Sequence, residues 1–242
     1  MVLKIKNNDF LNSFLTPLSK VTDSAIININ KGKISSLVSA SDNTIIVSAI
    51  YNDNSIDASK TLNIPDLKKF CRVLSCIDTN EYELDISSNF IGYTSKSMRF
   101  KYHLYDEGII TSPKVNIEKV KSLEFDGNFT LASSSIINLI KGSSICTDSN
   151  KLYLSVKDKD VLGEITDKVR ANVDSYGINI SNNYEGVQFA VPIPLNFEIF
   201  RIISSMRFKD INARLVSKMG VLTFDLNLDN TEFKFIISAL AN

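Results

Sequence analysis

The order of predicted secondary-structure elements runs through this chain twice, and that repeat most limits how the chain can fold. Alternating apolar and polar residues indicate strands, and apolar residues every three or four positions indicate helices. Each half of the 242 residues reads as a strand, a helix, four strands, a helix and three strands. The halves share little sequence, so the repeat is one of pattern. Two copies of one α+β domain are therefore expected.

The first half is predicted to consist mainly of strands, at 2–6, 24–30, 33–40, 43–51, 58–63, 81–87, 90–95 and 98–105. Helices are expected at 8–20 and 65–77. Pro65 suits the first turn of the second helix, and Asp66 complements the dipole at its start. Residues 1–106 are therefore assigned to a first domain.

Residues 107–120 contain Gly, Pro and polar residues that break the alternation, which predicts a connector between the domains. Residues 121–242 then form the second domain. Its helices are expected at 133–142 and at 194–206, the latter opened by Pro194. Its strands are expected at 121–131, 151–157, 160–167, 172–180, 187–191, 208–217, 220–228 and 231–239.

The composition, 44% apolar and 22% charged, is that of a soluble globular protein. The N-terminus alternates apolar and polar residues, unlike a signal peptide, and no stretch has the roughly 20 apolar residues that cross a bilayer. Cys71, Cys76 and Cys146 lack metal-like spacing, and we expect them to be small buried hydrophobic residues in a reducing compartment. These features predict a cytoplasmic protein without membrane contact, in the host cytoplasm if the source is a virus.

Charge is balanced overall but unevenly distributed between elements. The net charge is zero, yet the four predicted helices and the residue after the last one carry seven basic and three acidic side chains. Two of the acids, Asp9 and Asp66, lie at helix starts. Lys68 and Arg72 stand one turn apart, opposite Leu67 and Leu74. Such faces can be ordinary solvated surface, or they can follow a phosphate backbone without reading bases.

The residues give no sign of catalysis. His103, the single histidine, falls in an alternating strand and is expected to be structural or at an interface. The chain has no glycine-rich phosphate loop, no nucleophile elbow and no paired Cys and His at metal-ligand spacing. The acidic clusters at 158–160 and 225–229 fit turns and outer strand positions. We expect no enzyme activity, no cofactor and no metal.

The stretch "LNIPDLKKFCRVLSCIDTNEYELDISSNFIGYTSKSMRFKYHLYD" (62–106), with the repeated element order, resembles the DNA polymerase sliding clamps. These processivity factors include proliferating cell nuclear antigen and the clamps of tailed phages. The resemblance covers nearly the whole chain. It implies that helices line the inside of a ring of six domains and that antiparallel sheets form its outside, so two domains per subunit make a homotrimer. The implied partners are duplex DNA without sequence specificity, a replicative DNA polymerase and a clamp loader.

The resemblance assigns residues to three surfaces. The DNA-facing set is Lys20, Lys68, Lys69, Arg72, Lys141, Arg201, Arg207 and Lys209. The partner-binding set is Asp42, Thr44, Ile46, Ile109, Ile110, Val115 and Leu240, although these residues could instead only pack the domain seam. The subunit-interface set is Phe100, Tyr102, Leu104, Tyr176 and Ile178. The alternative function is a non-catalytic, β-rich structural or assembly protein of a virus.

Overall fold

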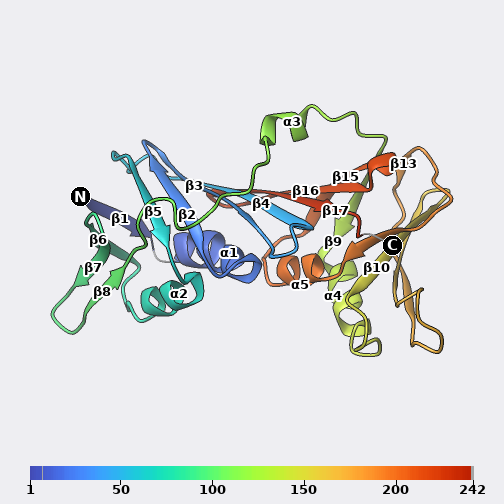
Figure 1. The fold of residues 1–242 in the computed structure, drawn as a ribbon, viewed down its shortest axis with the longest axis horizontal. Helices are drawn as coiled ribbons and strands as arrows, with labels where there is room; N and C mark the ends of the chain where they lie inside the picture. The colour runs from blue at the N-terminus through green and yellow to red at the C-terminus, as the bar shows by residue number, and fades with distance from the viewer. Residues whose placement is uncertain (7, 241–242) are drawn as a thin grey trace. The chain divides into compact units, whose positions relative to one another are not determined.

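The computed structural model describes residues 1–6 and 8–240 and divides into two compact units (Figure 1). The first unit comprises residues 1–41, 46–115 and 227–233. The second comprises residues 42–45, 116–226 and 234–242, of which 241 and 242 lie outside the described residues. Each unit combines antiparallel strands with short helices, as the sequence predicts.

The first unit begins with β1 (Val2–Lys6), a π-type helix (Asn8–Leu15) and α1 (Thr16–Val21). The strands β2 (Ala25–Asn30), β3 (Lys33–Ser39), β4 (Ile45–Asn52) and β5 (Lys60–Ile64) follow and pair in the order β4-β3-β2-β5. After α2 (Leu67–Ser75) come β6 (Glu81–Ile86), β7 (Phe90–Thr94) and β8 (Arg99–His103). A second antiparallel sheet has the order β1-β6-β7-β8, which leaves β8 at its edge.

The second unit repeats this plan with α3 (Ile117–Lys121), β9 (Gly127–Ala132) and α4 (Ser133–Gly142). One sheet has the order β12-β11-β10-β14, formed by β10 (Lys151–Lys157), β11 (Asp160–Ile165), β12 (Tyr176–Ser181) and β14 (Ile193–Asn196). The other begins β13-β9-β15-β16-β17. Its strands include β13 (Glu185–Gly186), β15 (Asp210–Val216), β16 (Val221–Leu228) and β17 (Thr231–Ser238), and a single turn (Ser217–Met219) joins β15 to β16.

Three predictions for the second unit are wrong: one strand, the start of one helix and the start of another strand. The expected strand 187–191 and helix from Pro194 are replaced by β14, which pairs with β10, and by α5 (Glu198–Ser204). Because β14 is an edge strand, Pro194 costs no hydrogen bond with a further strand. The expected strand 121–131 begins only at Gly127. Before it lies α3, in which the Asn116 side chain accepts hydrogen bonds from the Glu118 and Lys119 backbone N–H groups.

The helices bury an apolar stripe and expose a polar one. In α2, Leu67, Phe70 and Leu74 are buried, and the Asp66 carboxylate caps the helix by accepting the Lys69 backbone N–H at 2.8 Å. In α4 the buried residues include Ile136 and Leu139, and in α5 they include Ile199 and Ile202. The α1 and α2 helices contact each other within the first unit, and α4 and α5 within the second (Figure 1).

The strand β12 approaches α4 so closely that only glycine fits between them. A Cβ atom on Gly142 would lie 2.0 Å from the Tyr176 ring. Gly142 is therefore needed for packing in addition to ending the helix. Among the cysteines, Cys146 is buried and Cys71 half-buried, but the expectation of a buried Cys76 is wrong. Cys76 follows the end of α2 on its solvent side, where its thiol donates to the Arg72 carbonyl.

Tyr102 ties the edge strand β8 to the start of α2. Its side chain is 4% exposed, and its ring centroid lies 4.9 Å from that of Phe70. The hydroxyl donates to the Asp66 carbonyl at 2.7 Å and accepts the Asp66 N–H at 3.1 Å. One phenol thus satisfies two main-chain groups at a helix terminus, where partners are scarce.

We predict that Tyr102→Phe lowers the free energy of unfolding by ~1–3 kcal/mol, because it leaves the part-buried Asp66 N–H without a partner, while the Asp66 carbonyl keeps only its bond from the Phe70 N–H. Urea denaturation measures the loss. Tyr105→Phe is the matched control, since Tyr105 is 46% exposed. Equal stability of the two variants would contradict the anchoring role of the Tyr102 hydroxyl.

Candidate nucleic-acid interface

The predicted cations of the first unit are on the solvent faces of its helices. Lys20 lies in the last turn of α1, and Lys68, Lys69 and Arg72 lie on α2; all four are exposed. The Lys68 ammonium is 2.9 Å from the Asp23 carboxylate, but the two side chains are 61% and 82% exposed. Such a pair contributes little stability, so Lys68 can exchange Asp23 for another anion at low cost.

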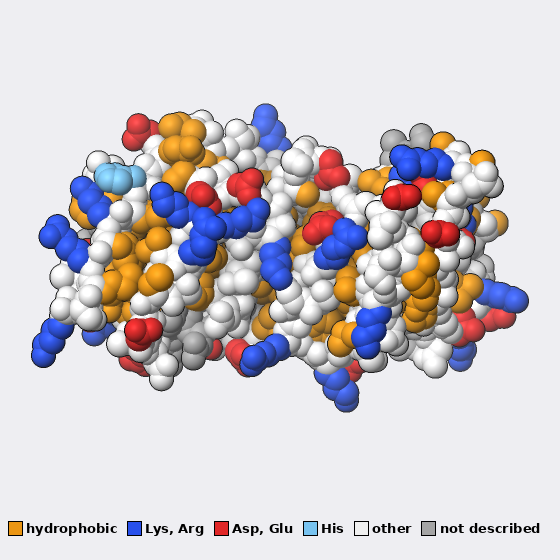
Figure 2. Space-filling model, turned by 90° about the horizontal axis from the view of Figure 1, so that it is seen from below, with side chains coloured by type: hydrophobic (Ala, Val, Ile, Leu, Met, Phe, Trp, Pro, Cys, Tyr) orange, Lys and Arg blue, Asp and Glu red, His pale blue; other side chains and the backbone are white. Residues whose placement is uncertain are grey.

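The predicted cations of the second unit are also exposed, on its helices or just after them. Lys141 and Arg201 are exposed in the last turns of α4 and α5, where a positive charge complements the helix dipole. Arg207 and Lys209 are exposed just beyond α5. Basic side chains are spread over the face seen in Figure 2, with acidic ones among them. The helices of each unit thus offer interchangeable cations without an aromatic stacking platform on their polar faces.

Arg201 differs from the other helix cations in having a set of fixed contacts. Its Nη1 donates to Asn150 Oδ1 at 2.7 Å and to Glu198 Oε2 at 2.9 Å. The guanidinium carbon lies 4.9 Å from the centre of the Phe197 ring. Arg201 is predicted from the sequence but Asn150 is not, because an asparagine after a turn gives no sign of its partner.

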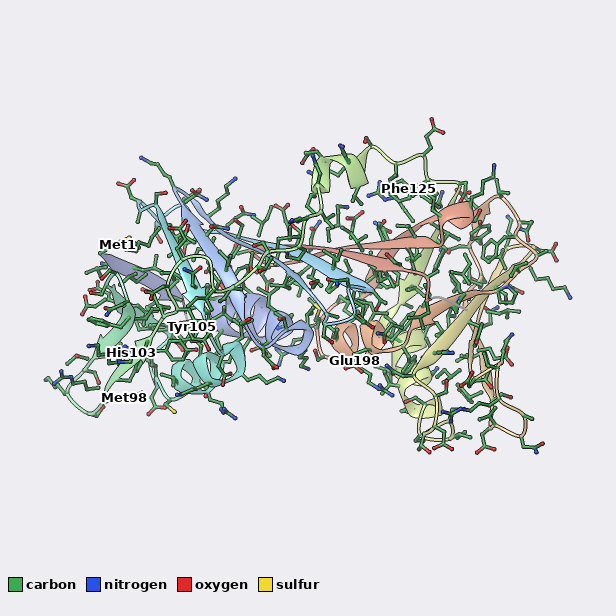
Figure 3. All side chains as sticks on the ribbon, in the orientation of Figure 1. Met1, Met98, His103, Tyr105, Phe125 and Glu198 are labelled. Carbon is green, nitrogen blue, oxygen red and sulfur yellow. The ribbon has the colours of Figure 1, made fainter. Side chains whose placement is uncertain are left out.

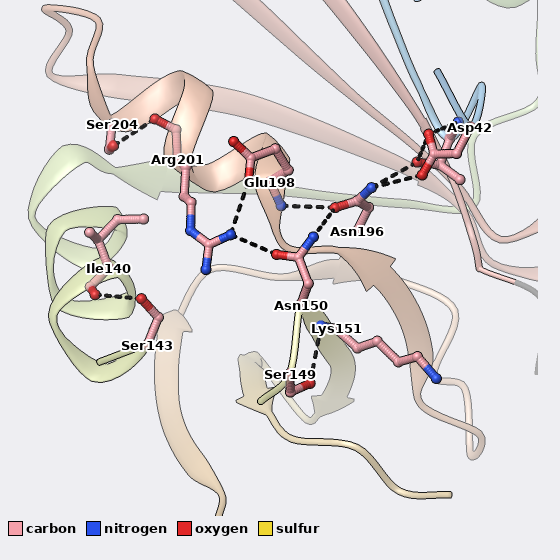
Figure 4. A network of polar contacts seen from close by, with 11 residues as sticks. Asp42, Ile140, Ser143, Ser149, Asn150, Lys151, Asn196, Glu198, Arg201 and Ser204 are labelled. Carbon is pink, nitrogen blue, oxygen red and sulfur yellow. Dashed lines mark hydrogen bonds and ion pairs between the residues drawn. The ribbon is translucent and has the colours of Figure 1, made fainter. Parts of the chain in front are cut away.

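A chain of side-chain amides leads from Arg201 to the turn at Asp42 (Figure 4). Asn150 Nδ2 donates to Asn196 Oδ1 at 3.0 Å. Asn196 Nδ2 donates in turn to Asp42 Oδ2 at 3.0 Å and to Thr44 Oγ1 at 3.1 Å. All of these residues belong to the second unit. Asp42 and Thr44, expected to contact partners, therefore also hold the structure of this unit together.

The Asp42 carboxylate is stabilised in its charged form. Partial burial acts to raise its pKa, but hydrogen bonds from the Thr44 backbone, the Thr44 hydroxyl and Asn196 outweigh burial, and the pKa lies below its usual value of 3.8. The carboxylate is thus ionised at neutral pH and forms the negative end of the amide chain.

The other predicted partner-binding residues fall into two groups. Near Thr44, the chain end is held by Ser238 N–H donating to the Thr44 carbonyl and by Leu240 N–H donating to the Pro194 carbonyl. In the first unit, Ile109 and Ile110 of the connector line a pocket with β2 and β3. Ile109 is 58% exposed, while Ile46 and Val115 are half-buried. The connector thus presents apolar side chains over the sheet.

The predicted interface residues lie on the edge strands β8 and β12 or directly after β8, and none of them is fully exposed. Tyr102 is buried, and Phe100, Leu104, Tyr176 and Ile178 are half-buried. Tyr102 is therefore not available as a partner contact, and that assignment is corrected. The alternating residues Arg99, Lys101 and His103 are the exposed ones on β8. Figure 3 shows His103 beside this edge, near Tyr105.

Apolar side chains are exposed beside both β8 and β12. A groove between α2 and β8 is lined by Pro65, Val73, Phe100 and Tyr105 together with charged residues such as Lys101. In the second unit, α4 contacts β12 and exposes Ile137, and Ile145 is exposed in the turn that follows. One edge strand of each unit is thus flanked by exposed apolar side chains.

Within residues 1–6 and 8–240, no three His, Cys, Asp or Glu side chains are grouped so as to hold a metal ion. Across the same described part of the chain, no helix has both the length and the apolar character needed to cross a membrane.

The chain matches no protein-family model and no curated protein sequence. Its structure is similar to proliferating cell nuclear antigen (PCNA) of A. fulgidus, solved with the C-terminal region of FEN-1 bound. The TM-score is 0.75 at 12% identity, over 100% of this chain and 98% of that one. PCNA of Entamoeba histolytica matches with a TM-score of 0.73 at 15% identity, over 99% of this chain and 98% of that one. A putative DNA polymerase III beta subunit of Eubacterium rectale matches with a TM-score of 0.75 at 12% identity, over 100% of this chain and 66% of that one.

These likenesses extend over the whole chain, and they show that it has the fold of the DNA sliding clamps. The fold expected from the sequence resemblance is confirmed.

Proposed function

We propose that this protein is a DNA polymerase processivity factor, a ring-shaped sliding clamp that encircles duplex DNA and tethers the replicative polymerase. The observation that carries the proposal is the clamp fold over the full chain, together with cations on the solvent faces of its helices. The role needs no catalytic group, because a ring retains DNA topologically and raises the local concentration of the enzyme that it tethers.

The helix cations would act as weak, interchangeable phosphate contacts. Most of them, such as Lys20, Lys69 and Arg72, are exposed side chains that can follow a moving backbone. Phosphate contacts carry no sequence information, so the ring would slide without preferring a site. The zero net charge of the chain fits this role, because affinity comes from closure of the ring and the contacts only centre the DNA.

The ring would form from three copies joined head to tail. Clamp domains 1–106 and 121–242, linked by 107–120, would make six domains in the trimer. The support is that each unit has an edge strand, β8 in the first and β12 in the second, with exposed apolar side chains beside it. Pairing β8 of one copy with β12 of the next is a heterologous contact, which closes when the rotation per subunit fits.

Polymerase and clamp loader would dock through peptides under the connector. The support is the pocket between the connector and β2–β3, with Ile109 exposed above it. The A. fulgidus clamp binds the C-terminal region of another protein, which is the kind of ligand such a pocket accepts. The turn at Asp42 and the segment at Leu240, both in the second unit, are proposed as further partner contacts.

The first prediction tests the DNA contacts with the quadruple variant Lys68→Ala, Arg72→Ala, Lys141→Ala and Arg201→Ala. We incubate protein with a bead-tethered linear duplex whose free end is open and measure the fraction retained at increasing salt. Because log retention then falls with log salt by ~0.9 per neutralised phosphate, the variant should show weaker retention and a flatter slope. When the free end is blocked after loading, the wild-type protein should withstand a high-salt wash, and restriction cleavage of the duplex should release it.

The control for this test is a charge-matched variant outside the helices, Lys33→Ala, Lys157→Ala, Lys159→Ala and Lys218→Ala. All four lysines are exposed. If both quadruple variants and the wild type have the same salt dependence, the helices are ordinary solvated faces. If cleavage releases nothing, the protein does not encircle DNA.

The second prediction tests the subunit edge. The bonds Ser95 N–H to Met98 O and Leu104 N–H to Asn89 O set the phase of the β7–β8 ladder, so the Lys101 N–H points away from β7. Lys101→Pro removes that donor without breaking the ladder and should yield monomers at micromolar concentration. Native mass spectrometry should show about 81 kDa for the wild type, three times the 27.0 kDa chain.

Lys101→Ala is the matched control, because it removes the same side chain and keeps the N–H. It should still give the trimer mass. A wild-type protein that is monomeric at micromolar concentration, or a Lys101→Pro variant that assembles as well as Lys101→Ala, would rule out pairing through β8.

The third prediction tests the docking pocket. Ile109→Asp places a charge where an apolar peptide side chain would be buried, so it should reduce stimulation of primer extension by the replicative polymerase of the same organism. Val187→Asp is the control, since Val187 is 57% exposed in the second unit. Both variants should keep the trimer mass. Full stimulation by Ile109→Asp would exclude the pocket as the docking site.

A further inference from the structure

Arg201 is held on one side and open on the other. Its guanidinium lies over the Phe197 ring, and its Nη1 corner donates to Asn150 and Glu198. The described residues place no acceptor on its Nε or Nη2, and its side chain is 42% exposed. A planar guanidinium fixed in this way presents a free edge with the fork geometry that matches a phosphate.

The amides behind Arg201 can adopt only one orientation. Asn196 Oδ1 accepts from Asn150 Nδ2 and from the Glu198 backbone N–H, while Asn196 Nδ2 donates to Asp42 and Thr44. A flipped amide would place donor against donor at Glu198 and acceptor against carboxylate at Asp42. The hydrogen bonds therefore run in one direction, from the cation at Arg201 to the anion at Asp42, and the end charges strengthen them.

The backbone beneath these side chains is held by regular structure. The Asn150 carbonyl accepts the Phe197 N–H at 2.9 Å, and Asn196 pairs with Lys151 in the β10–β14 ladder. The neighbouring Ser149 is buried and donates to the Thr166 carbonyl. Asn150 and Asn196 thus come from two paired strand ends, while Arg201 comes from the helix that follows.

We propose that Asn150 and Asn196 are positioning residues that hold Arg201 ready to bind a backbone phosphate of duplex DNA. This inference rests on the proposed function. It separates Arg201 from the flexible lysines of the helix faces: the lysines lose side-chain freedom when they bind, whereas Arg201 has lost much of it on folding. Arg201 is accordingly the strongest single phosphate contact of the second unit.

A double-mutant cycle tests the proposal, with Arg201→Ala, Asn150→Ala and the combination assayed on the bead-tethered duplex with its free end open. Arg201→Ala should reduce the slope of log retention against log salt by ~0.9 for each Arg201 of the ring that contacts a phosphate. Asn150→Ala keeps the Arg201 cation but removes one of the hydrogen bonds that fix its position. Retention at fixed salt should therefore fall by roughly 2- to 10-fold, as expected for one lost hydrogen bond. The combination should be no weaker than Arg201→Ala alone.

Asn138→Ala is the control, because Asn138 is an exposed asparagine on α4. Melting temperature and trimer mass establish that each variant is folded. Retention by Asn150→Ala equal to the wild type, or losses that add in the double variant, would overturn the positioning role while leaving the clamp function intact. Absence of retention in the wild type would overturn the proposed function itself, and this inference with it.

A second measurement does not depend on DNA. In Asn196→Ala the Asp42 carboxylate loses one of the hydrogen bonds that lower its pKa, so carboxyl-carbon NMR should show its titration midpoint moving up from the wild-type value. In Asn138→Ala the Asp42 titration should be unchanged. An Asp42 midpoint that is the same in Asn196→Ala as in the wild type would show that the amide chain does not form in solution.

Discussion

The burial of one apolar stripe per helix is the constraint on which the rest of this structure depends. Leu67, Phe70 and Leu74 must face the sheet for α2 to be stable, and a 3.6-residue period then leaves Lys68, Lys69 and Arg72 no direction but solvent. The same holds for Arg201 opposite Ile199 and Ile202. A basic surface on the helices is thus a consequence of packing, and it becomes a DNA-binding surface only if copies of the chain surround a duplex.

The edge strands β8 and β12 show how packing limits assembly. Their large side chains are needed inside, where Tyr102 secures the start of α2 and Tyr176 fills the space beside Gly142. What remains for a neighbouring copy is the main-chain edge, the outward residues Arg99, Lys101 and His103 on β8, and isoleucines beside β12. An interface built on main-chain hydrogen bonds would be specific in register, which suits the ring proposed above.

The amide chain from Asp42 to Arg201 joins segments that are distant in sequence. An ionised carboxylate and a guanidinium stand at its ends, and each of the two asparagines between them both donates and accepts. Such a network is strong only when every member is paired. One end lies at a turn proposed to contact protein partners and the other at a proposed phosphate contact, so a ligand at either end acts on the same set of hydrogen bonds.

The sequence by itself determined the periodic features: the repeated element order, the buried stripe of each helix and the exposed cations, because local spacing sets which face a residue occupies. It misplaced β14 and the start of β9, since a proline-containing edge strand and a capped helical turn differ from their alternatives only through their neighbours. It also assigned Tyr102 to a partner and overlooked Asn150 and Asn196. Only the tertiary structure decided these, because a hydrogen bond between residues 46 or 51 positions apart depends on strand pairing that no local pattern records.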